Sequence, residues 1–103
     1  MLDKATAREL ALRYADNVAK QVNPDAVIFF GSYVNGTPHQ WSDIDIAVVI
    51  DDFSGNWLEI SSMLYGLAWE LPAGIEPHLL DSKNDRSGFV EHVKKTGEVL
   101  YSR

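Results

Sequence analysis

Two aspartates two positions apart, Asp43 and Asp45, mark the start of the apolar run 44–50. Side chains at positions i and i+2 of a strand point to the same face, so both carboxylates are predicted to stand together at one end of a buried strand. Ionised carboxylates this close repel each other, and a bound divalent cation removes the repulsion. Because Mg²⁺ is held by one or two carboxylates together with substrate phosphates and water, the pair predicts a magnesium site.

A second feature lies upstream, separated from this pair by ten intervening residues: Gly31-Ser32 directly follows the apolar run 26–30. Glycine lets the backbone turn sharply and lets a phosphate approach closely. A helix beginning at Ser32 would add free backbone N–H groups and a hydroxyl to an anion site. The two features together predict a nucleoside triphosphate held at Gly31-Ser32, with its metal on the aspartates. The alternative is an ordinary turn followed by the solvated end of a strand.

The elements that must position these residues follow from periodicity and turn signals. Helices are predicted over residues 3–22, 57–71 and 88–95, strands over 26–30, 44–50 and 75–80, and a loop or short helix over 33–41. Either Asp3 or a Thr6–Glu9 capping box can begin the first helix. Pro77 has no N–H for a sheet ladder, so the third strand is predicted to be an edge or bulged strand. The fold class is therefore α/β or α+β with a small sheet.

Composition narrows the function. The 103 residues suit one domain and include no cysteine, which excludes a disulfide framework, a thiolate zinc site and a cysteine nucleophile, and fits a reducing compartment. Fifteen acidic against nine basic residues give a net charge of −6, which argues against broad binding to nucleic acid. No apolar run reaches the ~20 residues of a membrane span. Residues 1–11 show no export signal, so a cytoplasmic protein is expected.

With these residues in view, the chain resembles the minimal nucleotidyltransferases of the polymerase-beta-like superfamily. The Gly-Ser pair, the ten-residue gap and the Asp-x-Asp spacing match the superfamily signature in full, and the similarity runs from Asn23-Pro24 to the closing segment 96–101. The segments that carry the resemblance most strongly are 29–33, Gly36 and 42–49. It implies a single nucleotidyltransferase domain over residues 1–103, with a small mixed sheet of three to four strands packed with helices.

The resemblance also implies a third carboxylate on the later strand, and the matching position is Glu76, where the superfamily more often has Asp. Asp43, Asp45 and Glu76 would then be the catalytic residues and would hold two Mg²⁺ ions. Nucleotide binding would fall to Gly31, Ser32 and Ser42. A further departure is Asn35, because relatives often carry Arg or Lys at the position before Gly36.

The implied reaction is nucleotidyl transfer, in which an acceptor hydroxyl attacks the α-phosphorus of ATP and pyrophosphate leaves. Minimal nucleotidyltransferases resemble the antitoxin half of a toxin–antitoxin pair whose toxin is an all-helical HEPN protein, and some members adenylylate a tyrosine of that toxin. The acidic charge suits a basic protein partner. Two alternatives stay open: an enzyme that nucleotidylates a small molecule, as antibiotic-modifying relatives do, and a non-catalytic module that neutralises its partner by contact.

Other side chains are weaker candidates. His39, His78 and His92 are too scattered to predict a zinc site, although His78 lies two residues from Glu76 and could share its face. Trp41 could face the nucleotide because it lies beside the carboxylates in the chain. Trp57 and Trp69 fit one helix, where tryptophan serves a core or an interface.

Overall fold

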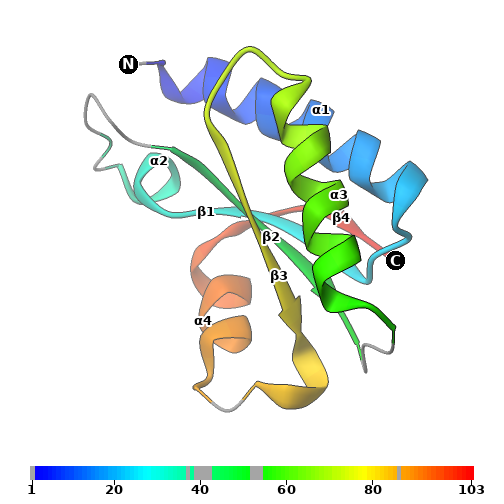
Figure 1. Cartoon of the computed structure of the whole chain (residues 1–103). Coiled ribbons are helices and arrows are strands. Elements are labelled where there is room, and N and C mark those ends of the chain that lie inside the picture. The colour runs from blue at the N-terminus through cyan, green and yellow to red at the C-terminus, as the bar shows by residue number, and fades with distance from the viewer. Residues whose placement is uncertain (1, 37, 39–42, 52–54, 86) are drawn as a thin grey trace.

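The computed structural model describes residues 2–36, 38, 43–51, 55–85 and 87–103. The elements in chain order are α1 (Lys4–Gln21), β1 (Ala26–Phe30), α2 (Ser32–Asn35), β2 (Ile44–Ile50), α3 (Trp57–Trp69), β3 (Ile75–Asp81), a 3₁₀ turn (Ser82–Asn84), α4 (Phe89–Thr96) and β4 (Glu98–Ser102). Figure 1 shows the strands as one twisted sheet between helices. The α/β class with a small mixed sheet is confirmed.

The sheet has four strands in the order β3-β2-β1-β4. β2 pairs parallel with β3, while β1 pairs antiparallel with both β2 and β4. The individual strand predictions did not include β4, and the segment after Gly97 adds it to the sheet beside β1. β3 lies at the end of the strand order, as the proline in its sequence predicted.

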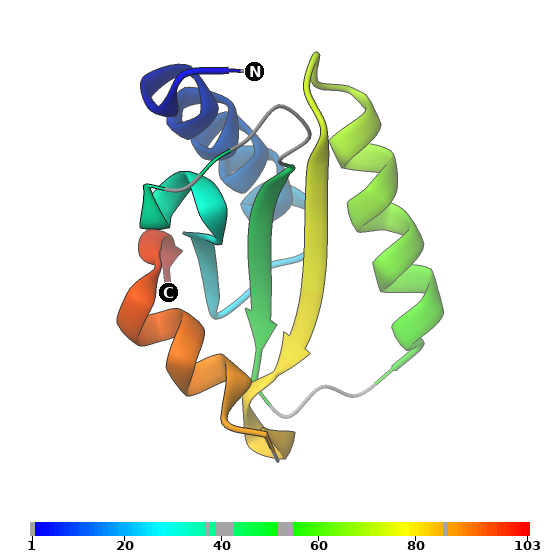
Figure 2. The ribbon, with the colours of Figure 1, turned by 90° about the vertical axis from the view of Figure 1, so that its left-hand side faces the viewer.

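Alternate residues of the central strands β1 and β2 pack into two separate hydrophobic cores, one on each face of the sheet. On one face, Val27 and Phe29 of β1 and Ile46 of β2 belong to the larger core, which also includes buried residues of α1 and α3. On the other face, Ile28 and Ala47 belong to a smaller core with Val90 and Val93 of α4. The division follows from the strand period of two. Figures 1 and 2 accordingly show α1 and α3 on one side of the sheet and α4 on the other.

Local capping chemistry sets where the longer helices begin. Asp3 caps α1, since its carboxylate accepts a hydrogen bond from the Thr6 backbone N–H at 2.7 Å, so the Asp3 alternative is the one realised. Asn56 caps α3 in the same way through the Glu59 N–H at 3.0 Å. The buried Tyr14 hydroxyl donates to the Leu64 carbonyl at 2.7 Å and ties α1 to α3. None of the described helices combines the length and apolar character needed to cross a membrane.

Candidate active site

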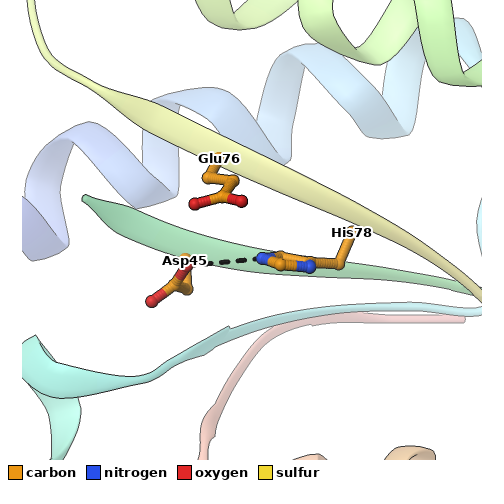
Figure 3. A group of neighbouring side chains, drawn as sticks. All are labelled: Asp45, Glu76 and His78. Atoms are coloured by element: carbon orange, nitrogen blue, oxygen red, sulfur yellow. Dashed lines mark hydrogen bonds and ion pairs between the residues drawn. The ribbon is translucent and has the colours of Figure 1, made fainter.

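Three side chains meet on the α4 side of the sheet, at the end where β2 begins. Asp45 is the second residue of β2 and lies opposite Glu76 in the parallel ladder with β3. His78 follows two positions after Glu76 and shares its face. One ligand atom from each of the three lies within 4.8 Å of the others (Figure 3). We call these three residues the carboxylate–histidine group.

His78 is tied to Asp45 inside this group. Its Nε2 lies 3.3 Å from Asp45 Oδ1, and both side chains are partly buried. The hydrogen bond to Asp45 raises the pKa of His78; burial opposes the shift, and the negative charges of Asp45 and Glu76 reinforce it. The Phe30 ring meets the imidazole edge-on, with centroids 5.2 Å apart, and in turn contacts Phe89 at the start of α4. The aromatic contacts and the hydrogen bond therefore fix the orientation of the imidazole.

The backbone of Gly31 contacts the Asp45 carboxylate on the side away from His78. Its φ of +89° lies in the region that favours glycine, and a β-carbon there would collide with Asp45 Oδ2. The chain then enters α2 at Ser32, and the Asn35 N–H donates to the Gly31 carbonyl at 2.9 Å. Of the loop and the short helix that the sequence left open after Gly31, the structure has a short helix, α2, which places Ser32 beside the Asp45 end of β2.

Asp43, unlike Asp45, lies just outside the sheet ladder. It is exposed and precedes β2, whose ladder with β3 starts at the Ile44–Ile75 pair. Its Oδ1 lies 3.0 Å from the point where a β-carbon on Gly74 would stand, and the carboxylate is not part of the carboxylate–histidine group. Strand alternation applies within a ladder, and Asp43 lies just before it. Asp45 and Glu76 thus belong to the carboxylate–histidine group, while the Asp43 carboxylate lies beside Gly74, at the rim of the site and outside that group.

The remaining candidates from the sequence divide into two sets. Ser42, Trp41 and His39 lie outside the described residues. His92 is exposed on α4. His78, which from the sequence was only a weaker candidate that could share the face of Glu76, belongs to the group. The signal that could have found it is the i, i+2 spacing from Glu76, combined with a β2–β3 register that no local pattern reveals.

Comparison with known proteins identifies the family. Residues 15–103 match the polymerase beta nucleotidyltransferase domain. The chain belongs to the polymerase beta nucleotidyltransferase family. The resemblance stated from the sequence motifs is confirmed, and the mixed sheet with its helices is the nucleotidyltransferase fold. Comparison of this nucleotidyltransferase with curated proteins gives no match.

Solved structures share the fold. A candidate nucleotidyltransferase from Sulfolobus solfataricus superposes with a TM-score of 0.69 at 21% identity, covering 97% of this chain and 84% of the other. A toxin–antitoxin structure with AMP-PNP gives a TM-score of 0.65 at 25% identity, covering 89% of this chain and 73% of the other. A toxin–antitoxin MntA-HpeT variant gives 0.59 at 24% identity, with 99% and 75% covered.

The donor set of the site fits a divalent cation. Two carboxylates and an imidazole nitrogen converge from two adjacent strands, and the three donors lie close enough together for one ion to contact them all. Paired carboxylates without a counter-charge would repel each other, and here the His78 ring stands beside them. Among the described residues, Asp45, Glu76 and His78 form a group whose donor atoms could hold a metal ion.

Proposed function

We propose that this nucleotidyltransferase transfers the nucleoside monophosphate of a triphosphate, with ATP as donor, to an acceptor hydroxyl. The observation that carries the proposal is the β2–β3 register, which sets Asp45 opposite Glu76 while the Gly31 backbone lies against Asp45. A metal-binding pair and the Gly-Ser turn thus adjoin each other, as a bound triphosphate and its metal require. We propose the cytoplasm as its compartment, because ATP is available there.

The proposed roles follow from position. Asp45 and Glu76 would hold Mg²⁺ from adjacent strands, and Asp43 would contribute its carboxylate from the rim beside Gly74. When bound, two such ions supply charge neutralisation for the attacking and leaving oxygens. Glu76 has a second possible role, accepting the proton of the acceptor hydroxyl.

Phosphate contacts are assigned to the turn after β1. Ser32 begins α2 directly after Gly31, and its hydroxyl and the neighbouring backbone N–H groups would hold the departing pyrophosphate. Ser42 is proposed as a further nucleotide contact because of its place before Asp43 in the motif. Catalysis in such a site consists mainly of positioning and charge neutralisation.

A protein acceptor is supported by the outer face of α3. Leu58, Tyr65 and Trp69 are 74%, 48% and 86% exposed, and their spacing of seven and four residues places them on one side of the helix. We call these three residues the α3 outer face. Large exposed apolar patches mark interaction sites. Two structural neighbours are toxin–antitoxin proteins, and we propose a HEPN-type toxin as partner and acceptor.

A hollow extends from the α3 outer face to Gly74, just before β3, while the carboxylate–histidine group lies on the opposite, α4 side of the sheet. This open hollow of about 360 Å³ is lined by Tyr65, Trp69 and Gly74 among others, and Gly74 is the residue next to the Asp43 carboxylate. Helix α3 carries Glu59 and neither lysine nor arginine. A partner helix with apolar and basic side chains would therefore complement this surface and bring a hydroxyl near the rim of the site.

The test is co-expression with the product of the neighbouring gene, followed by mass spectrometry of that product. A mass increase in nucleotide units that disappears with Asp45→Asn supports the proposal. Asp16→Asn, which removes an exposed carboxylate paired with Lys20 on α1, is the matched control and should leave the increase intact. A stable complex without any mass change would favour a module acting by contact alone. Transfer to a small hydroxyl compound without complex formation would favour the small-molecule enzyme.

A further inference from the structure

We propose that His78 is a direct metal ligand of this site, and that its nitrogen makes the site prefer Mn²⁺ to Mg²⁺. The inference rests on the proposed function only in taking a divalent ion to bind beside Asp45. It goes beyond a carboxylate-only metal site because it assigns a third donor of a different element. That donor changes which metal the protein selects.

The distances suit coordination. Two ligands at adjacent positions around an octahedral ion, with bonds of roughly 2.1 Å, stand about 3 Å apart. His78 Nε2 and Asp45 Oδ1 are 3.3 Å apart, and Glu76 adds an oxygen within the same 4.8 Å group. One ion can therefore contact all three donors after small side-chain adjustments, without any change in the sheet.

The sheet itself presents these donors. Asp45 and Glu76 are paired in register, and His78 stands two residues farther on the same face of β3. Figure 3 shows the imidazole lying across β2 with one nitrogen directed at Asp45 and the Glu76 carboxylate above the gap between them. Because all three side chains project from hydrogen-bonded strands, their relative positions are set before any metal binds.

The surroundings hold the imidazole in this orientation. The ring is packed edge-on against Phe30, which Phe89 supports from α4, so Nε2 stays directed at Asp45. Asp45 is confined from the other side, because its Oδ2 lies against the Gly31 backbone while its Oδ1 faces His78. The packing of the ring against Phe30 and the contact of Nε2 with Asp45 therefore orient the imidazole before a metal binds.

The nature of the donor decides the metal. Carboxylate and water oxygens suit Mg²⁺, whereas imidazole nitrogen favours first-row transition ions. Mn²⁺ accepts both kinds of ligand and the same octahedral arrangement, so a mixed set of two carboxylates and one imidazole favours it. A purely oxygen site would lack this additional preference.

The direct test is pulsed electron paramagnetic resonance of the full chain loaded with Mn²⁺ from manganese chloride. A bound histidine nitrogen modulates the electron spin echo, and ¹⁵N-labelled histidine changes the modulation frequency. We expect ¹⁴N modulation in the unaltered protein. It should be absent in His78→Gln and retained in His92→Gln, the matched control on the exposed side of α4. The measurement on the unaltered protein alone can overturn the proposal, because Mn²⁺ bound without nitrogen modulation excludes His78 as a ligand.

Affinity gives a second readout. We expect His78→Gln to weaken Mn²⁺ binding roughly tenfold or more and to change Mg²⁺ binding much less. Equal weakening of both ions would contradict the proposal and indicate a structural role. Nitrogen modulation in a protein without transfer activity would leave this inference standing while the proposed function failed. Transfer with Mg²⁺, together with bound Mn²⁺ that shows no nitrogen modulation, would support the proposed function and overturn the assignment of His78 as a ligand. Absence of any metal binding would overturn both the proposed function and the His78 assignment.

Discussion

The backbone of Gly31 lies against the carboxylate of Asp45, with no room for a β-carbon between them. Gly31 therefore serves two purposes, since its φ of +89° turns the chain from β1 into α2 and its lack of a side chain leaves room for the Asp45 carboxylate. The Gly-Ser and Asp-x-Asp parts of the motif are joined by this contact. Although they are separated in the sequence, the Gly-Ser turn and the second aspartate of the Asp-x-Asp motif are in direct contact in the fold.

This contact predicts the effect of Gly31→Ala. The substitution should cost roughly 1–3 kcal/mol of stability from the unfavourable backbone conformation, and it should also displace Asp45 and abolish metal binding. Gly36→Ala is the matched control, because Gly36 has a similar φ of +78° but open space where the β-carbon would stand. Urea unfolding measures the first effect and Mn²⁺ titration the second. Equal metal affinity in the two variants would show that the Asp45 contact is unimportant.

Substitutions of Asp43 and Asp45 should have different effects on metal binding by the nucleotide-free protein. Asp45→Asn removes a member of the carboxylate–histidine group and is expected to abolish metal binding, whereas Asp43→Asn, at the rim, should leave most of it. Both substitutions should lower transfer by roughly 10²–10⁴, since each removes a charge proposed to stabilise the reacting phosphates. Calorimetric titration with metal and a radiolabelled-ATP transfer assay check the two parts. Loss of metal binding in Asp43→Asn alone would reverse the assignment.

The ion pair between α1 and β4 predicts a pH dependence of stability. Arg8 contacts both oxygens of Glu98, with Nη2–Oε2 at 2.6 Å and Nε–Oε1 at 3.0 Å, and this contact lowers the pKa of Glu98 below its usual 4.5. A carboxylate with a depressed folded-state pKa stabilises the fold above its unfolded value, and this contribution is lost as the pH falls.

Glu98→Gln should therefore lower stability modestly at pH 7 and weaken its decline below about pH 4.5, because the group that titrates is gone. Thermal melts across this range provide the measurement. Asp16→Asn, which breaks a fully surface pair with Lys20, is the comparison and should alter the profile less. An unchanged slope in Glu98→Gln would mean that the pair contributes nothing to acid sensitivity.

The α3 outer face predicts a variant that separates folding from partner binding. Trp69→Ser should change stability by no more than about 0.5 kcal/mol, because the side chain is 86% exposed, yet it should weaken capture of the toxin-type partner at least tenfold. Val99→Thr, on the exposed part of β4, is the control and should bind normally. Unfolding curves and pull-down with the neighbouring gene product test both statements. Normal partner capture by Trp69→Ser would place the interface elsewhere.

The strands nearest the site could be predicted closely from the sequence. Residues 26–30 and 44–50 form β1 and β2 at the predicted bounds, because runs rich in apolar, β-branched and aromatic residues suit strands buried on both faces. β4 was not predicted as a strand, and its partner β1, which is equally short, lies some 70 residues earlier in the chain. Pairing over that separation depends on the assembled sheet and not on local pattern.

The site shows the same division between local and long-range information. The motif predicted Asp45 and Glu76 as site residues, and the register placed them opposite each other. The membership of His78 in the carboxylate–histidine group depends on that register, and so does the place of the Asp43 carboxylate beside Gly74. These positions depend on the tertiary structure and not on local sequence, since a shift of one residue in the β2–β3 register would turn His78 to the other face of the sheet.

Pro77 affects how readily the edge of the sheet can pair with another protein molecule. β3 is an outer strand, and an outer strand can template the addition of a strand from another molecule. Proline has no N–H, so a chain approaching this side would lack one hydrogen-bond donor in the middle of the seven-residue strand. The residue between Glu76 and His78 thus discourages aggregation at this edge of the sheet, and it keeps β3 from becoming an interior strand.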